Sequence, residues 1–286
     1  MTKTFPETAA QYTRRVLGYR GKAKKALGQN FLINDRVIER IVAEGLPSDT
    51  AFPLVEIGPG PGGLTRELIK RDQPLWVVEL DKEKVAILKR EFTQDKINIL
   101  NMDALKLNLA ELWGDQKGWL IGNLPYYITN PLLRHFLAQK DSLFGLTVMV
   151  QKEVADRMLA PPGGKEYGLL SIAVQLAAEP LKLFEVSATA FYPQPKVKSA
   201  VVKLVLRPYP GLEIEESMLM RVAKAAFAQR RKTLLNTLSA GLGLTKNDIS
   251  MVLQQAGIEP KQRAEELSIS DYQKICQILK HSGLLV

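Results

Sequence analysis

The chain has 286 residues, of which 46% are hydrophobic, so it can bury one large core or one large and one small core. Its single cysteine cannot form a disulfide within the chain, its two histidines lie far apart, and no apolar run approaches the roughly 20 residues of a membrane helix. These features argue against a disulfide-rich secreted protein, a metal centre of cysteines or histidines, and a membrane-spanning protein, and they favour the cytoplasm.

Positive charge is concentrated at the N-terminus. The net charge is +9, and the first 30 residues hold seven basic side chains against one acidic one, Glu7. Such clustering favours nucleic acid as a partner, because binding to phosphates releases counterions. A solvated positive surface is the alternative, and an acid-poor start is also a weak feature of mitochondrial targeting peptides. We expect residues 1–30 to form a basic arm.

From residue 53 onward, short apolar runs alternate with amphipathic stretches. The apolar runs predict strands at 53–57, 75–80, 97–100, 119–121 and 144–150. The stretches between them predict helices at 63–71, 81–92 and 104–112, with Asp81 as the N-cap of the second. Strands that alternate with helices are typical of an α/β domain with a mostly parallel sheet.

The pattern changes in the second half of the chain. Helices are predicted at 151–159 and 168–178, and further strands at 181–186 and 200–206. Prolines and a glycine at 207–211 end regular structure, and only three or four short helices follow. We therefore expect a large α/β domain at 31–207 and a small helical domain at 208–286.

A glycine-rich turn, Glu56-Ile-Gly-Pro-Gly-Pro-Gly-Gly63, follows the first of these strands. Glycines allow a backbone to approach a ligand closely, so a nucleoside or a phosphate can lie against the turn. Glu79 ends the next strand, 21 residues after Gly58, where a carboxylate can accept hydrogen bonds from ribose hydroxyls. The pattern predicts a nucleoside cofactor. Taken literally as G-x-G-x-x-G, it leaves a dinucleotide open.

Asp103 lies just past the third strand. In a doubly wound sheet this position belongs to the same carboxyl edge as Gly58 and Glu79. Asp103 can accept a hydrogen bond from an adenine amino group of the cofactor. Its alternative role is simply to cap the helix predicted at 104–112.

The segment Asn123-Leu-Pro-Tyr126 follows the fourth strand at that edge and indicates the chemistry. An adenine amine is a poor nucleophile, and the Asn123 side-chain oxygen and the Leu124 carbonyl can accept hydrogen bonds from its two N–H groups. Pro125 stiffens the turn, and Tyr126 can stack on the base. An activated sulfonium donor needs neither a metal nor a strong base. The sequence thus predicts methyl transfer from S-adenosylmethionine, without a metal.

In this order, the motifs resemble those of the small-subunit (16S) ribosomal RNA adenine dimethyltransferases, the KsgA (RsmA) family. The resemblance covers nearly the whole chain and includes 25–32, 191–199 and 227–236. It implies a Rossmann-like methyltransferase domain with a seven-stranded, mostly parallel sheet and a helical RNA-binding domain. It also implies N6,N6-dimethylation of two adjacent adenosines in a hairpin near the 3′ end of the rRNA, with S-adenosylhomocysteine as product. The implied partner is rRNA in an immature small subunit, and the implied enzyme is a cytoplasmic monomer.

The resemblance also implies roles for single residues. Cofactor contacts are expected at Asn30, Leu32, Gly58, Glu79, Asp103 and Asn123. The target base is expected to lie against Asn123, Leu124, Pro125 and Tyr126, with Phe191 over its other face. Ordinary core packing is the alternative for Phe191. RNA contacts are expected at Lys22, Lys24, Lys25, Arg230, Arg231 and Lys232, the last three in one predicted helix. A charged helix face that is merely solvated is the alternative there.

Other functions stay open at this point. An Erm-type large-subunit rRNA methyltransferase would share the catalytic half, but 227–236 and the full helical tail favour the small-subunit family. A ribosome-assembly factor with secondary methylation is a second alternative, and an NAD-dependent dehydrogenase rests only on the literal glycine pattern. The sequence leaves open the order of the two methylations, the assembly state of the subunit, the phenotype of lost activity and the role of the extension before Lys22.

Overall fold

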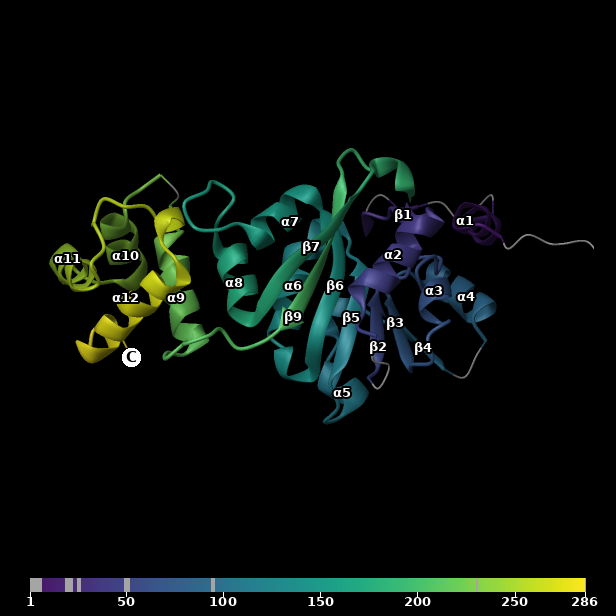
Figure 1. The fold of residues 1–286 in the computed structure, drawn as a ribbon, viewed down its shortest axis with the longest axis horizontal. Coiled ribbons are helices and arrows are strands. Elements are labelled where there is room, and N and C mark those ends of the chain that lie inside the picture. The colour runs from purple at the N-terminus through teal and green to yellow at the C-terminus, as the bar shows by residue number, and fades with distance from the viewer. Residues whose placement is uncertain are drawn as a thin grey trace, which may run out of the picture. The chain divides into compact units, whose positions relative to one another are not determined.

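The computed structural model describes residues 7–18, 23–24, 27–48, 52–93, 96–229 and 231–285. Lys22, Lys25 and Arg230, three of the expected RNA contacts, lie outside the described residues. The chain divides into two compact units, one formed by Met1–Ala155 with Pro180–Leu206 and the other by Asp156–Glu179 with Arg207–Val286 (Figure 1). No helix in the described part of the chain is both long and apolar enough to cross a membrane.

The first unit is built on a seven-stranded sheet of order β4-β3-β2-β5-β6-β9-β7. Its strands are β2 (Leu54–Ile57), β3 (Leu75–Glu79), β4 (Ile97–Asn101), β5 (Gly118–Asn123), β6 (Leu143–Gln151), β7 (Ala178–Val186) and β9 (Ser199–Leu206). The five strands from β4 to β6 run parallel, and β9 runs antiparallel to β6. All seven expected strands are present, so the predicted α/β fold with a mostly parallel sheet is confirmed.

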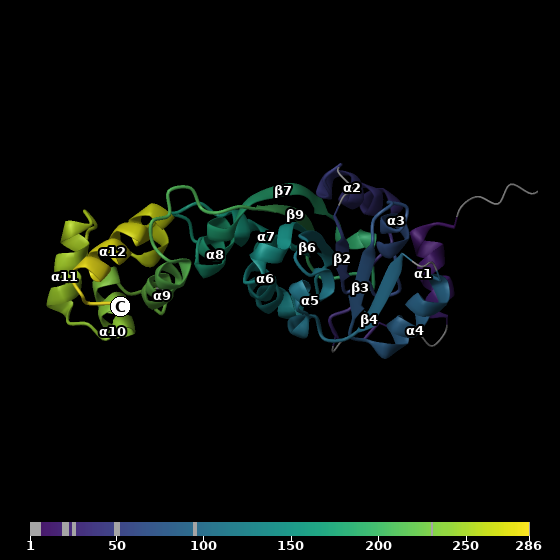
Figure 2. The same ribbon diagram turned by 90° about the horizontal axis from the view of Figure 1, so that it is seen from below.

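Helices cover both sides of this sheet, with α2 and α3 on one side and α5 and α6 on the other (Figure 2). The helices of this unit beyond the N-terminal one are α2 (Asp35–Gly45), α3 (Thr65–Leu68), α4 (Lys82–Glu91), α5 (Leu109–Trp113) and α6 (Thr129–Leu137), with 3₁₀ turns η2 (Ala104–Lys106), η3 (Tyr126–Ile128), η4 (Lys140–Ser142) and η5 (Ala188–Ala190). The Asp81 side chain accepts a hydrogen bond from the Glu83 amide (3.0 Å), which confirms its predicted capping role. The helix predicted at 104–112 is broken, because Asn108 begins a new one by accepting from the Ala110 amide.

The N-terminal arm contains structure that the sequence analysis did not predict. Helix α1 (Ala9–Leu17) begins at Thr8, which forms a capping box with Gln11. Its Tyr12 and Val16 side chains are buried in the main core of this unit. Farther along, β1 (Phe31–Leu32) pairs antiparallel with β8 (Phe191–Tyr192). The expected arm is therefore partly a packed helix.

The second unit is helical. It contains the end of α7 (Lys152–Leu159), α8 (Leu169–Ala177), α9 (Glu216–Ala226), α10 (Leu234–Leu242), α11 (Lys246–Gln255), η6 (Ala264–Glu266) and α12 (Ile269–His281). The expected boundary at residue 207 differs from this division, because 156–179 belong to the helical unit. The reason is packing, since Tyr167, Ile172 and Leu176 are buried in one cluster with Leu219 of α9.

The predicted basic helix around Arg231 is wrong in one respect. Arg231 and Lys232 lie between α9 and α10, not within a helix. The amides of Leu234 and Leu235 donate to the carbonyls of Gln262 and Pro260, at 2.8 and 3.3 Å. These tertiary bonds satisfy the first amides of α10 and fix its start, so α9 and α10 are separate helices.

Candidate active site

A cavity opens at the carboxyl edge of the parallel strands, where ligands bind in open α/β sheets. It encloses about 990 Å³ when the part open to solvent is included. The segments that line it are 27–32, 56–61, 63–64, 78–80, 102–104 and 123–128, with Leu132. Five of these six segments follow or end strands of the sheet or precede α3. The first comes from the N-terminal region.

The glycine turn after β2 forms one wall of the cavity. Gly58 and Gly60 have φ angles of 68° and 57°, which side chains rarely adopt. A Cβ on Gly60 would lie 2.8 Å from the Phe31 ring, and one on Gly63 would lie 2.9 Å from the Leu32 carbonyl oxygen. The turn is thus a bare backbone surface that β1 approaches closely. This glycine turn, called the cradle below, has no side chains that would keep a nucleoside cofactor away from its backbone.

The Glu79 carboxylate lies at the floor of this cradle. One oxygen accepts a hydrogen bond from the Gly60 amide (3.0 Å), and the other accepts from the Asp81 amide (2.8 Å). Burial raises the pKa of Glu79, and the two backbone amides oppose that rise. Each carboxylate oxygen has a further lone pair, so Glu79 can hold the glycine turn and still accept from a ribose hydroxyl.

Glu56 is a second buried carboxyl beside the turn. Its side chain accepts a hydrogen bond from the Thr65 hydroxyl (2.6 Å). Burial raises the pKa of Glu56 to about 8, the Thr65 hydrogen bond partly offsets this, and the neighbouring Glu79 charge adds to it. At neutral pH, Glu56 is therefore protonated in the folded protein, whereas the same side chain is ionised in the unfolded chain.

This difference predicts a pH dependence of stability. Because the folded pKa of Glu56 lies above the unfolded value of 4.5, the free energy of unfolding falls as pH rises from about 4.5 to about 8. Glu56→Gln removes this titration. We therefore expect the free energy of unfolding of the variant, measured relative to that of the wild type, to be ~1 kcal/mol or more higher at pH 8 than at pH 5. Thermal unfolding without cofactor at both pH values measures the gain, with the surface variant Glu44→Gln as control. An equal difference from wild type at both values would contradict the prediction.

Asn123 ends β5 at the rim of the cradle. Its Nδ2 donates to the Asn30 carbonyl (2.8 Å), and the Asn30 Nδ2 in turn donates to the Gly28 carbonyl (3.2 Å). This bond fixes the orientation of the Asn123 amide and leaves its Oδ1 as an acceptor. Asn30 and Asn123, which lie 93 positions apart, are thus brought together as the sequence analysis expects.

The next three residues continue this wall. The Leu124 amide donates to the Met149 carbonyl (3.1 Å), which ties the segment to β6. Pro125 has φ −59° and ψ 126°, and the Tyr126 hydroxyl lies 2.7 Å from the Ser199 Oγ. The Tyr126 ring is therefore held at its far end by β9. A ring fixed in this way is suited to stack on a flat base.

Two other expected site residues have structural contacts of their own. Asp103 lines the cavity and also caps η2, because its Oδ1 accepts from the Leu105 amide (2.9 Å). Phe191 is 3% exposed and packs in the main core, and it is absent from the described residues that line the cavity. The structure thus shows the capping role of Asp103 and favours core packing for Phe191.

Lys24, which was expected to contact RNA, instead forms ion pairs within the protein. Its Nζ lies 2.8 Å from Asp81 Oδ1 and 3.3 Å from Glu83 Oε1, while Gln29 Nε2 donates to Asp81 Oδ2 (3.1 Å). The Lys24 ammonium is thus already paired with two carboxylates, which argues against a phosphate contact. Asp81 instead anchors the segment that leads into β1, a role that sequence reasoning missed because it depends on a contact across 57 positions.

Tyr127 was also missed. It lines the cavity with 54% of its surface exposed, and a Cβ on Gly28 would lie 3.0 Å from its ring. The sequence indicated Tyr127 only through its position directly after Tyr126.

In the described part of the chain, no three His, Cys, Asp or Glu side chains are grouped so that they could hold a metal ion.

Solved structures share this architecture. A dimethyladenosine transferase from Plasmodium falciparum matches with a TM-score of 0.77 at 23% identity, covering 88% of this chain and 98% of that one. The 23S rRNA methyltransferase ErmE matches with a TM-score of 0.66 at 22% identity, covering 88% and 100%. At these identities the likeness concerns the fold. The fold and the cradle together define a Rossmann-like domain with a site for a nucleoside cofactor.

Sequence comparison gives the family. Residues 20–281 match the family model described as ribosomal RNA adenine dimethylase. A protein named ribosomal RNA small subunit methyltransferase A from Desulfitobacterium hafniense (strain DSM 10664 / DCB-2) is 58% identical over 95% of this chain and 97% of its own. One of the same name from Moorella thermoacetica (strain ATCC 39073 / JCM 9320) is 42% identical over 90% and 93%. The chain belongs to the ribosomal RNA adenine dimethylase family and is an S-adenosylmethionine-dependent rRNA methyltransferase.

Proposed function

We propose that this enzyme dimethylates the N6 atoms of two adjacent adenosines in a hairpin near the 3′ end of small-subunit rRNA. One observation carries the proposal, namely that the glycine turn, Glu79, Asp103 and 123–126 line a single cavity. The first three suit a nucleoside cofactor and the last suits an adenine base. The names of the relatives at 58% and 42% identity support the small subunit as the source of the rRNA. We further propose that the enzyme acts as a cytoplasmic monomer on an immature subunit.

The cofactor side of the cavity is proposed to comprise Asn30, Leu32, Gly58, Glu79 and Asp103. Bound S-adenosylmethionine supplies a methyl group that its sulfonium already activates. Glu79 is the acceptor for the ribose hydroxyls, and Asp103, which also caps η2, is the acceptor for the cofactor's adenine amine. Asn30 and Leu32 close the cradle from the N-terminal side, where β1 lies against Gly60 and Gly63.

The substrate side is proposed to comprise Asn123 to Tyr126. The Asn123 Oδ1 and the Leu124 carbonyl accept from the two N–H groups of the target amine, which favours a pyramidal and more nucleophilic nitrogen. Tyr126, fixed by Ser199, stacks on the base after it leaves its place in the hairpin. Asn123 is held for this task by its bond to Asn30, so it meets both the cofactor side and the substrate side.

RNA contacts outside the cavity are proposed at Arg231 and Lys232. Both are exposed, and the loop between α9 and α10 that carries them projects two adjacent positive charges. Basic side chains on a surface loop contact phosphates and position an RNA without reading its sequence. Arg230, Lys22 and Lys25 remain candidates from the sequence alone.

Transfer of labelled methyl groups tests the proposal. We expect the enzyme to transfer methyl from S-adenosylmethionine to small subunits isolated from cells that lack this modification, with N6,N6-dimethyladenosine as the product. Small subunits that already carry the modification are the matched control and should accept no label. Incorporation into large-subunit rRNA, with none into small subunits, would overturn the proposal in favour of an Erm-type substrate.

A further inference from the structure

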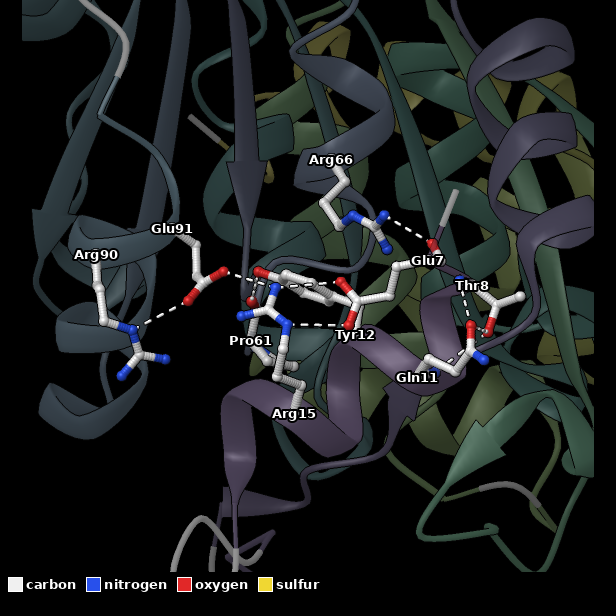
Figure 3. A network of polar contacts seen from close by, with 9 residues as sticks. All are labelled: Glu7, Thr8, Gln11, Tyr12, Arg15, Pro61, Arg66, Arg90 and Glu91. Atoms are coloured by element: carbon white, nitrogen blue, oxygen red, sulfur yellow. Dashed lines mark hydrogen bonds and ion pairs between the residues drawn. The ribbon is translucent and has the colours of Figure 1, made fainter. Parts of the chain in front are cut away.

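Helix α1 lies ahead of the residues that match the family model. The match begins at residue 20, whereas α1 spans Ala9–Leu17. From its charge, this region was expected to be part of a basic arm, with nucleic acid as the favoured partner. In the structure, α1 instead lies against the elements that carry the glycine turn, and Figure 3 shows the polar contacts that join them.

The central contact joins Tyr12 to the turn itself. The Tyr12 hydroxyl donates to the Pro61 carbonyl (2.8 Å), and Pro61 lines the cavity while Tyr12 does not. Burial raises the pKa of Tyr12 well above its ordinary value, so the hydroxyl keeps its proton at every physiological pH. Pro61 has no amide hydrogen, so its carbonyl oxygen is the one backbone atom through which this residue can form a hydrogen bond. The Tyr12 hydroxyl supplies that hydrogen bond.

The Tyr12 ring is itself fixed from both sides. The Arg66 guanidinium lies 4.4 Å from the ring centroid and that of Arg15 lies 5.3 Å from it. Arg66 follows the turn in α3 and also donates to the Glu7 carbonyl (2.9 Å). Arg15 is paired with Glu7 and with Glu91 of α4, each at 2.9 Å (Figure 3). Helix α1 thus contacts α3, α4 and the glycine turn that precedes α3.

The rest of the turn is held by other elements. Gly60 is held through its amide by Glu79, and Gly62 is so close to α4 that a Cβ would lie 2.5 Å from the Phe92 ring. Pro61 lies between these two supports. Its carbonyl accepts a hydrogen bond from Tyr12, a residue that is 3% exposed. The turn therefore lies against Glu79 at the end of β3, Phe92 at the end of α4 and Tyr12 of α1.

We propose that Tyr12 is a positioning residue for S-adenosylmethionine and that α1 is part of the cofactor site of this enzyme, acting as a brace on the glycine turn. This inference rests on the cofactor role proposed for that turn. A turn whose backbone is held in its binding conformation binds a ligand more tightly, because less freedom is lost on binding. Without the Tyr12 hydroxyl, the Pro61 carbonyl is left buried and unpaired, and the turn relaxes.

Tyr12→Phe in the full chain tests the brace, because it removes the hydroxyl and keeps the ring. We expect the dissociation constants of S-adenosylmethionine and S-adenosylhomocysteine, measured by calorimetry without RNA, to rise about three- to tenfold. The KM for S-adenosylmethionine should rise by the same factor, while kcat at saturating cofactor changes less than twofold. Tyr272→Phe is the matched control, because it removes an equally buried hydroxyl bond to a carbonyl, that of Ala264 (2.8 Å), in the helical unit.

The control separates positioning from stability. Both variants should lose similar thermal stability, and only Tyr12→Phe should lose cofactor affinity. If wild type and Tyr12→Phe bind with equal affinity, or if Tyr12→Phe and Tyr272→Phe lose affinity equally, the brace is refuted. If the wild type itself binds no S-adenosylmethionine, the proposed cofactor role of the turn fails instead. The two failures are therefore distinct.

Discussion

Asn123→Ala is expected to lower kcat for rRNA methylation at least about a hundredfold, the usual cost of removing one preorganised hydrogen-bonding group from a reacting centre. Two effects combine in this variant. The target amine loses the acceptor that favours its reactive geometry, and the Asn30 carbonyl loses the donor that holds it at 2.8 Å. Loss of the second contact should also weaken S-adenosylmethionine binding, by about tenfold or less.

The assay is single-turnover methyl transfer at saturating S-adenosylmethionine, so that the loss of cofactor affinity does not enter the rate. Asn247→Ala, which removes an exposed asparagine of α11, is the control and should retain the wild-type rate. Binding of Asn123→Ala to under-methylated small subunits should stay within about twofold of wild type. A variant that methylates at more than a tenth of the wild-type rate would contradict the role given to Asn123.

The same variant separates the enzyme from an assembly factor. If the chain acted chiefly by binding immature subunits, Asn123→Ala should restore subunit maturation in cells that lack the protein. If methylation is the main function, the variant should bind the subunit and fail to restore it. Asn123 suits this purpose because its contacts lie at the rim of the cavity, while Leu124 beside it is buried and tied to β6.

The sheet and the composition of its carboxyl edge were predictable from the sequence, because both follow from local patterns. Strands β2, β3 and β5 are buried apolar runs, and parallel strands place the residues after them at one edge. Glu79 and Asn123 were placed in this way, and both line the cavity. The positive φ of Gly58 and Gly60 was likewise encoded by residue type.

The parts that could not be predicted depend on contacts between distant segments. Strands β1 and β8 have two residues each, and they exist because Leu32 and Phe191 pair across the chain. That pairing buries Phe191 in the core, whereas the motif around it indicated a base contact. Lys24 belongs to the same group, since its charge indicated RNA and its position beside Asp81 made it an anchor.

Helix α1 was missed for a related reason. Five of its nine residues are apolar and two are basic, but the positive charge concentrated in the first 30 residues indicated a basic arm and not a packed helix. The contacts of Tyr12 with Pro61 and Arg66 hold this helix against the rest of the unit. Neither contact can be predicted from the local sequence, because each joins residues that are far apart in the chain. The basic loop at 231–232 shows the opposite error, because the local helical pattern was strong and hydrogen bonds to Gln262 and Pro260 interrupted it.

Glu79→Gln is expected to raise the dissociation constant of S-adenosylmethionine about a hundredfold, although the two side chains have nearly the same shape. Both oxygens of Glu79 are acceptors, one for the Gly60 amide and one for the Asp81 amide. A glutamine offers one oxygen and one NH₂ group, so one of the two backbone amides must face a donor. Either the Gly60 amide in the glycine turn or the Asp81 amide at the start of α4 then loses its hydrogen bond.

The ribose contact is weakened at the same time, because a charged acceptor becomes neutral. Hydrogen bonds to charged groups are worth about 1.5–3 kcal/mol, and the loss of one such bond together with a displaced turn accounts for a factor near one hundred. Calorimetric titration with S-adenosylmethionine measures this factor, and Glu44→Gln, at an exposed ion pair with Arg40, should leave it unchanged. Affinity within threefold of wild type would contradict the role given to Glu79 as the acceptor for the ribose hydroxyls.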